Sequence, residues 1–177
     1  MEQLKVDFNK VMESLKLSEK SIISRKENFN QFVENGFPNK RVEDWKFSDL
    51  NQIISSNIKN LRFHTDFEIS EIDETTFIDK FAHNKIIFLN GVISKVDFSC
   101  EDDTKVLITR DLNQNENSKE VNSLVSLNNA LIASYIRVTV KENYSMNEPL
   151  IIYNITTKDL KSTVINLKTD IVLEKNS

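Results

Sequence analysis

Apolar residues in the first third of the chain recur at three- and four-residue steps, the spacing that places side chains on one face of a helix. Ser18 can cap the start of the second helix, and Gly36 can end it because glycine readily adopts positive φ. Pro38 then prevents the helix from resuming. We therefore predict two amphipathic helices and a short third one that starts at Ser48. Their apolar positions are Leu4, Phe8, Val11, Met12 and Leu15, then Ile22, Ile23, Phe29, Phe32 and Val33, then Leu50, Ile53 and Ile54.

The pattern changes from helix to strand in the middle of the chain. Residues 58–79 show no sustained period, and we predict a loose segment there, with a short helix near Glu74–Phe81. Two apolar runs, Lys85–Leu89 and Val92–Val96, then flank Asn90-Gly91. Asn-Gly favours the type I′ turn, in which both central residues have positive φ. The sequence therefore predicts a β-hairpin, followed by another strand at Lys105–Thr109.

The last third combines one helix with alternating strands. Residues 113–119 are polar and predict a surface loop. The helix after it carries Val121, Leu124, Val125, Asn128, Leu131 and Ile132 on a broad face. The run Leu150–Ile155 is nearly continuous in apolar residues. The alternating apolar positions are Ile136, Val138 and Val140, and later Ile165, Leu167, Ile171 and Leu173. This alternation predicts strands with one buried face.

Composition narrows the function classes. The chain has 177 residues, of which 39% are hydrophobic, enough for a folded core. The net charge of −4 argues against nucleic acid as a partner, and two glycines argue against a glycine-rich phosphate loop. The start of the chain lacks an apolar signal core, and no apolar run approaches the roughly 20 residues that cross a bilayer. We expect a cytoplasmic protein, or a stromal one after processing.

A segment after the second predicted helix carries a specific resemblance. It reads Phe37-Pro38-Asn39-Lys40-Arg41-Val42-Glu43-Asp44-Trp45-Lys46-Phe47-Ser48-Asp49-Leu50. It resembles SufD proteins of the SufB/SufD family, which show Leu-Pro, a basic pair, an acidic pair, Trp-Lys-Tyr, Thr and Leu there. Phe47 and Ser48 replace the common Tyr and Thr, and they keep an aromatic body and a capping hydroxyl.

A second stretch is similar to the same family. It runs from Leu127-Asn128-Asn129-Ala130-Leu131 through Ile136-Arg137-Val138 to Glu148-Pro149-Leu150. This order of a short helix, a strand, a turn and a proline-led strand resembles the family's entry into its β-helix. The two matches touch most of the chain from Asn35 onward.

The resemblance implies a fold class and a set of partners. The expected fold is α+β: an N-terminal helical region at residues 1–83, a small hairpin and connecting helix at 84–134, and the first coils of a right-handed parallel β-helix at 135–177. The implied role is a non-enzymatic scaffold for iron-sulfur cluster assembly, acting with SufB-like and SufC-like subunits. The cluster is handled by the full complex, and the resemblance carries no catalytic, cofactor-binding or metal residue onto this chain. We interpret the chain as an N-terminal part that lacks the SufC-binding end.

The basic and aromatic residues of the first motif have a structural and a functional interpretation. Trp45 could bind a ligand, but a lone tryptophan more often anchors packing, and we favour that interpretation. Lys40, Arg41 and Lys46 could contact a phosphate or a partner's carboxylates. Their interleaving with Glu43 and Asp44 instead predicts a locally compensated surface.

Catalytic and metal-binding arrangements have weak support in this sequence. His64, His83 and Cys100 are the only residues of their types. The acidic neighbours of Cys100 disfavour a thiolate, so a Cys/His nucleophile pair is not expected. One acidic series invites a calcium interpretation but lacks the spacing of an EF-hand loop, and we expect a solvated face. That series comprises Asp66, Glu68, Glu71, Asp73, Glu74 and Asp79.

The last predicted strand has two interpretations. The face formed by Ile165, Leu167, Ile171 and Leu173 is either ordinary core or a surface for further coils or a partner chain. The second interpretation predicts self-association through the exposed end of the β-helix. Two other function classes stay open: a small protein- or glycan-binding β module, and a hydrolase that uses Cys100 or an acidic pair.

Overall fold

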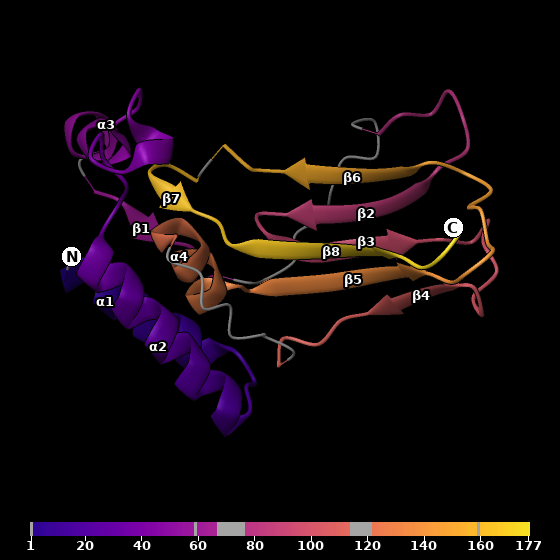
Figure 1. The fold of residues 1–177 in the computed structure, drawn as a ribbon, viewed down its shortest axis with the longest axis horizontal. Coiled ribbons are helices and arrows are strands. Elements are labelled where there is room, and N and C mark those ends of the chain that lie inside the picture. Colours follow the sequence, from indigo (N-terminus) through magenta and orange to yellow (C-terminus); the bar gives the residue numbers. More distant parts are fainter. Residues whose placement is uncertain (1, 59, 67–76, 114–121, 159) are drawn as a thin grey trace. The chain divides into compact units, whose positions relative to one another are not determined.

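The protein has a mixed α+β fold (Figure 1). The computed structural model describes residues 2–58, 60–66, 77–113, 122–158 and 160–177. These residues belong to two compact units, the first comprising Met1–Thr65, Leu112–Ala133 and Lys161–Asn166, the second Asp66–Asp111, Ser134–Leu160 and Leu167–Ser177. The helices are α1 (Glu2–Ser14), α2 (Glu19–Asn35), the 3-10 turn η1 (Glu43–Trp45), α3 (Leu50–Asn57) and α4 (Ser123–Leu131). The strands are β1 (Arg62–Phe63), β2 (Asn84–Leu89), β3 (Val92–Asp97), β4 (Val106–Thr109), β5 (Ser134–Val140), β6 (Leu150–Ile155), β7 (Thr163–Val164) and β8 (Leu167–Leu173).

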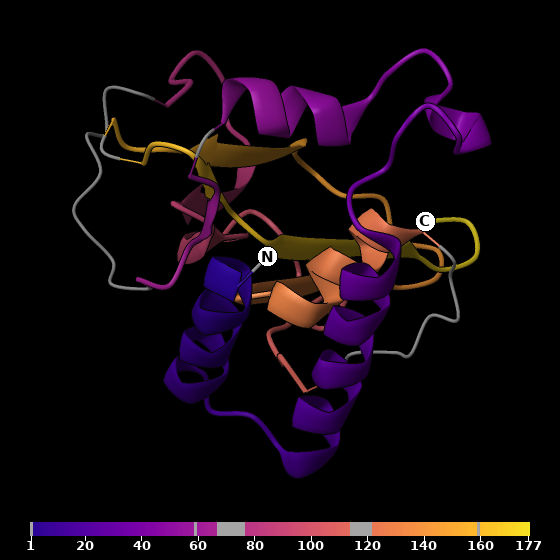
Figure 2. The same ribbon diagram turned by 90° about the vertical axis from the view of Figure 1, so that its left-hand side faces the viewer.

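The first two helices form as the sequence predicts, and α2 packs along α4 in the first unit (Figure 2). Phe8 of α1 stacks on Phe29 of α2 with ring centroids 4.1 Å apart. The Ser18 side chain accepts a hydrogen bond from the Ser21 N–H at 3.3 Å, which confirms Ser18 as the N-cap. Gly36 has a φ of 67° and donates its N–H to the Phe32 carbonyl, which confirms that it ends α2.

The buried face of α2 differs from the expected one. Phe29 and Phe32 are buried as predicted, but Ile23 is 52% exposed. Arg25 and Asn28 are buried instead. The helix turns this polar face inward because the Arg25 guanidinium supplies hydrogen-bond donors to carbonyl groups at the end of α4.

The third helix begins later than predicted. Ser48 donates its N–H to the Trp45 carbonyl in a turn, and the Asp49 side chain caps α3 by accepting from the Gln52 N–H at 2.8 Å. Of the helix expected near Glu74–Phe81, residues 74–76 lie outside the described residues, and residues 77–81 are not helical. The Ile78 N–H instead donates to the Tyr153 hydroxyl at 3.2 Å.

The second unit contains two three-stranded sheets, with strand orders β3-β2-β6 and β4-β5-β8. The predicted hairpin is confirmed: β2 pairs antiparallel with β3, and Asn90 and Gly91 have φ of 51° and 82°. The predicted polar loop falls mostly outside the described residues, as does Val121, and α4 is described from Ser123. In Figure 1, β6 lies along β2 and β8 lies along β5, and both pairs are parallel. In the first unit, β1 and β7 form a third parallel pair.

The core of the second unit lies among strands from both of its sheets. Its fully buried members are Ile86, Phe88, Val106, Ile136 and Val138. The predicted alternation along β5 is confirmed, because Ile136, Val138 and Val140 are buried. The expectation of a buried face along β8 is wrong for its second half, where Ile171 is 53% and Leu173 is 63% exposed.

Candidate interaction surface

Strands β5 and β8 form a parallel pair with a constant sequence offset. Arg137 lies beside Asp170, Val138 beside Ile171, and Val140 beside Leu173. The offset between partners is 33 residues. Because facing residues in a parallel pair point to the same side of the sheet, each inward-pointing residue of β5 has an inward-pointing neighbour on β8. The chain therefore returns to the same position after 33 residues and adds a strand there.

The inward-pointing apolar residues are buried on β5, but their neighbours on β8 are exposed. Val138 is fully buried, and its neighbour Ile171 on β8 is more than half exposed. Val140 and its neighbour Leu173 show the same contrast. Ile171 and Leu173 therefore have the orientation of core residues, although 53% and 63% of their surfaces are exposed.

The backbone of β8 has an open edge. The Glu174 N–H donates to the Val140 carbonyl at 3.0 Å, and the Ala133 N–H donates to the Asn166 carbonyl at 3.1 Å. These bonds show that the N–H and C=O groups of the even-numbered residues of β8 point toward β5. The N–H and C=O groups of its odd-numbered residues therefore point away from β5. In the strand order β4-β5-β8, that other side has no neighbouring strand among the described residues. Thr169, Ile171 and Leu173 thus present N–H and C=O groups at an open edge, and the last two add apolar side chains.

A polar cluster on the opposite face joins β8 to β5. The Tyr135 hydroxyl donates to Asp170 Oδ2 at 2.8 Å, and Arg137 Nη2 donates to the same oxygen at 3.2 Å. Lys168 Nζ lies 3.7 Å from Asp170 Oδ1. Arg137 and Lys168 also lie 5.9 and 5.8 Å from the centre of the Tyr135 ring. A hydroxyl, two cations and an aromatic ring therefore surround one half-buried carboxylate.

Electrostatics at this cluster shift two pKa values. Burial, followed by the hydrogen bond to Asp170, raises the pKa of Tyr135 to about 12. Burial also raises the pKa of Asp170, but the hydrogen bonds from Tyr135 and Arg137 and the charges of Lys168 and Arg137 outweigh it, so that the net pKa is lowered. Farther along the pair, Lys141 Nζ lies 2.8 Å from Glu174 Oε1 and lowers the pKa of Glu174. All of these contacts stabilise β8 in its register on β5.

The segment of the first motif lies at the surface of the first unit. Lys46 Nζ is 3.2 Å from Glu43 Oε1, which is a local ion pair of the kind expected. Lys40, Arg41 and Asp44 are exposed. Trp45 is half-buried rather than fully buried, and with Phe37, Pro38 and Val42 it lines a hollow of about 320 Å³. Phe47 is 89% exposed, with Lys46 Nζ 5.2 Å from its ring centre.

The contacts of His83 do not include Cys100. His83 Nε2 lies 2.9 Å from the Tyr153 hydroxyl, and its Nδ1 lies 3.0 Å from the Phe81 carbonyl. His64 belongs to the first unit, where its N–H donates to the Val164 carbonyl. Cys100 is exposed in the second unit.

The acidic series falls largely outside the described residues. This applies to Glu68, Glu71, Asp73 and Glu74, whereas Asp66 and Asp79 are described and exposed. Among the residues that the structure describes, no three His, Cys, Asp or Glu side chains are grouped so that they could hold a metal ion.

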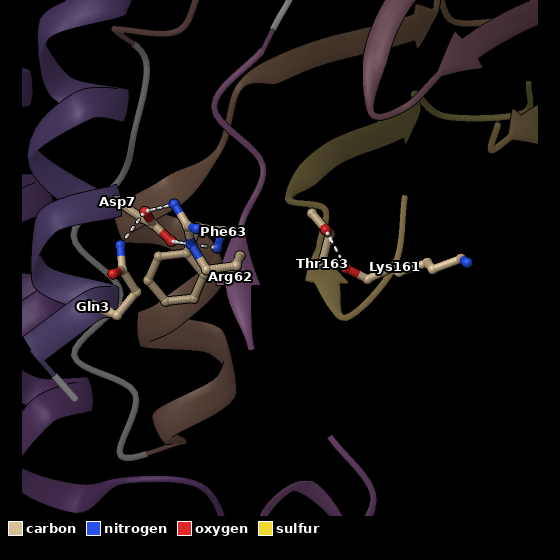
Figure 3. A network of polar contacts seen from close by, with 6 residues as sticks. All are labelled: Gln3, Asp7, Arg62, Phe63, Lys161 and Thr163. Carbon is tan, nitrogen blue, oxygen red and sulfur yellow. Dashed lines mark hydrogen bonds and ion pairs between the residues drawn. The ribbon is translucent and has the colours of Figure 1, made fainter. Parts of the chain in front are cut away.

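Two buried charges were missed by the sequence interpretation. The Asp7 carboxylate is fully buried and accepts bonds from Arg62 Nε and Nη2, both at 2.8 Å (Figure 3). It also accepts from the Phe63 N–H at 3.1 Å, which ties α1 to β1. The hydrogen bond from Arg62 is the main cause that lowers the pKa of Asp7.

The second missed charge is Arg25. Its Nη1 donates to the carbonyls of Ile132 at 2.8 Å and Ala130 at 3.3 Å, at the end of α4, where carbonyls lack helical partners and a cation is favoured. Burial lowers the pKa of Arg25 to about 10, so it stays protonated at neutral pH. Both missed residues occupy helix-stripe positions, Asp7 between Leu4 and Phe8 and Arg25 between Ile22 and Phe29.

No model of a known protein family matches the chain, and a search of curated proteins finds no match either.

None of the helices described by the structure combines the length and apolar character that crossing a membrane requires.

Proposed function

We propose that the chain is a scaffold subunit in SUF-type iron-sulfur cluster assembly and that it acts through protein surfaces shared with SufB-like and SufC-like subunits. The observation that carries the proposal is the parallel register of β5 and β8, in which the chain adds a strand after 33 residues and leaves its outer edge open. Such a strand offers backbone groups and apolar side chains to another protein. In this role the protein needs no catalytic site of its own, and the iron-sulfur cluster is cargo of the assembled complex.

The order of elements supports the family assignment. The motif at residues 37–50 resembles the SufD segment, and the later match at residues 127–150 coincides with α4, β5 and the start of β6. The resemblance in this part of the chain is to the same order of a helix, a strand, a turn and a strand. The proposal therefore combines a sequence resemblance with a matching order of structural elements.

A right-handed parallel β-helix is the proposed finer description of the strands. The chain leaves β5, forms β6 and β7, and comes back as β8 beside β5. Connections between parallel neighbours in one sheet are right-handed in nearly all proteins. Both β6 and β7 also pair in parallel with earlier strands, β2 and β1. Stacked coils of this kind contact only their neighbours, so a terminal coil presents a surface that another chain can cover.

Co-purification tests this function. The tagged 177-residue chain is co-expressed with the SufB-like and SufC-like subunits of its own organism. We expect it to retain the SufB-like subunit, and to retain no SufC-like subunit when the SufB-like one is omitted. A chain carrying Phe47→Ala is a control for the motif at residues 37–50. Phe47 is suitable because its side chain is exposed and it does not belong to a strand. The three combinations are the chain with the SufB-like subunit, with the SufC-like subunit, and with both. If the chain retained neither subunit in any of them, the proposal would be contradicted.

The alternative of a carbohydrate- or protein-binding β module is not favoured by the exposed aromatics. Such a module needs aromatic side chains on an exposed sheet face. Among the described residues, the strongly exposed aromatic side chains are Phe47 and Phe81, and both lie outside strands. The hydrolase alternative also lacks support, since the described contacts of His83 do not include Cys100.

A further inference from the structure

We infer that a hollow in the first unit binds a small amphipathic carboxylate, with the carboxylate group on Arg62 and the apolar part against α3. The hollow, here called the Arg62 hollow, is lined by residues of α1, α3, β1 and the segments beside them, and its volume is about 570 Å³. Binding sites for small molecules have volumes of roughly 300–1,000 Å³. All of the lining residues belong to the first unit. The inference goes beyond the scaffold role and does not depend on a SufB-like or SufC-like subunit.

Apolar side chains form one part of the Arg62 hollow. Ile54 and Ile58 lie one turn apart at the end of α3, where the Ile58 N–H donates to the Ile54 carbonyl at 2.9 Å. Residues four apart share one face of a helix, so both side chains can contact the same ligand. Leu4 is buried, and Phe37 and Leu61 are half-buried, and all three also line the hollow. An apolar group that covers these side chains removes them from water, which favours binding.

Arg62 supplies the charged part of the hollow. A guanidinium has five N–H donors arranged in a planar fork. Nε and Nη2 of Arg62 donate to the two carboxylate oxygens of Asp7, both at 2.8 Å (Figure 3). Nη1 donates to no residue that the structure describes. Nη1 and the second N–H of Nη2 can therefore form a paired contact with a ligand carboxylate. The Arg62 side chain is 45% exposed, so a ligand in the hollow can reach it.

Asp7 holds the guanidinium of Arg62 in one orientation. The Asp7 carboxylate is fully buried, and it also accepts hydrogen bonds from Gln3 Nε2 at 3.0 Å and from the Phe63 N–H at 3.1 Å. These contacts fix the carboxylate and, through its paired bonds, the plane of the guanidinium. Binding to a side chain that is already oriented costs less conformational entropy.

The charges favour a carboxylate over other head groups. Among the described residues that line the hollow, Arg62 is the only charged one, so an anion meets no carboxylate on the wall. Asp7 already offsets the positive charge of Arg62. A ligand with one negative charge is therefore better accommodated than a phosphate monoester, which carries about −1.5 to −2 charges at pH 7. A neutral alcohol cannot form the charge-assisted paired contact with the guanidinium.

Titration with octanoate, followed by amide NMR spectra of the full chain at pH 7, tests the binding. We expect saturable shifts of the amide signals of Leu4, Ile54 and Leu61 and of the Nε–H signal of Arg62. The compound for comparison is 1-octanol, which has the same chain length without the charge and should bind at least about tenfold more weakly. If millimolar octanoate caused no saturable shifts at these residues, the inference would be overturned. Equal affinity for 1-octanol would overturn it as well.

A conservative change at Arg62 tests the role of the guanidinium. Arg62→Lys keeps a positive charge beside Asp7 but lacks the planar fork that makes the paired contact. It should weaken octanoate binding by at least about tenfold and leave 1-octanol binding unchanged. An Arg62→Lys chain that binds octanoate as tightly as the wild type would refute the assignment of the carboxylate to Arg62.

Two neighbouring serines of α3 provide a test that leaves the ion pair intact. Ser55 is exposed and lines the hollow, so Ser55→Trp places a large side chain in the space of the ligand and should abolish saturable octanoate binding. Ser56→Trp is the matched control, because Ser56 is exposed on the same helix and does not line the hollow. It should bind octanoate like the wild type. Equal octanoate binding by the two variants would overturn the inference, and this pair keeps the test valid if Arg62→Lys proves unstable.

Discussion

Arg137 of β5 donates a hydrogen bond to Asp170 of β8 across a parallel pair whose members lie 33 residues apart, with Nη2 and Oδ2 separated by 3.2 Å. Lys141 and Glu174 repeat this ion pair at the same sequence offset, with 2.8 Å between Nζ and Oε1. A slip of β8 by two residues would keep its apolar side facing inward but would break both ion pairs. The charges therefore specify the register that the apolar alternation leaves open.

The contrast between the two neighbouring strands predicts different costs for the same substitution. Ile136→Ala should lower the free energy of unfolding by about 2–5 kcal/mol, because it removes a fully buried side chain and leaves a cavity. Ile171→Ala should lower it by less than about 1 kcal/mol in the monomer, because this side chain is mostly in solvent. Urea unfolding of dilute protein measures both. Equal costs for the two would show that β8 is covered.

The Asp170 cluster predicts a dependence of stability on pH. The folded pKa of Asp170 is lowered, so its stabilising contribution is present above the unfolded value of about 3.9 and is lost as pH falls through the folded value. Asp170→Asn should therefore lower the free energy of unfolding by about 1–2 kcal/mol at pH 7. The difference between wild type and variant should shrink below about pH 4. A difference that stays constant down to pH 2 would contradict this role of the carboxylate.

Removal of the buried cation in the first unit should be costly. Arg25→Ala should lower the free energy of unfolding by about 3 kcal/mol or more, because it opens a cavity and leaves the carbonyls of Ala130 and Ile132 without their donor. Arg41→Ala is the matched control, since Arg41 is exposed, and it should change stability by less than about 0.5 kcal/mol. Circular dichroism during urea unfolding follows both variants. Similar midpoints would mean that Arg25 does not hold the end of α4.

The Asp7–Arg62 pair predicts a smaller effect. Asp7→Asn should lower the free energy of unfolding by about 1–3 kcal/mol, because the amide cannot accept both bonds from the guanidinium. The cost stays below that of a fully buried ion pair because the Arg62 side chain is 45% exposed and can turn to water. Thermal unfolding at pH 7, with Asp44→Asn as an exposed control, measures the difference. An Asp7→Asn variant as stable as the control would refute the tie between α1 and β1.

The sequence predicted the helices and strands better than it predicted which of them contact each other. The helix stripes around Phe8 and Phe29 and the turn at Asn90-Gly91 were found because local spacing and turn chemistry determine them. Asp7 and Arg25 were missed because only apolar residues were counted as members of a stripe, although both charged residues occupy its spacing. A charge at a stripe position is a signal that can be searched for.

The interaction surface shows a second limit of local patterns. Alternation correctly gave the side to which Ile171 and Leu173 point, but it carries no information about whether another strand covers them. The equal spacing of Arg137 to Asp170 and of Lys141 to Glu174 could have indicated the pairing of β5 with β8. Otherwise, the pairing of strands that are distant in the sequence depends on contacts that leave no periodic pattern in either strand.

Amide hydrogen exchange along β8, measured by NMR at several protein concentrations, tests the central claim that this strand stacks in parallel on β5 and leaves its other edge open. We expect the N–H groups of Lys168, Asp170, Val172 and Glu174 to be protected at every concentration, since they point toward β5. The N–H groups of Thr169, Ile171 and Leu173 should exchange fast, because they point away from β5. Protection of both sets in dilute protein, or of neither, would contradict the account.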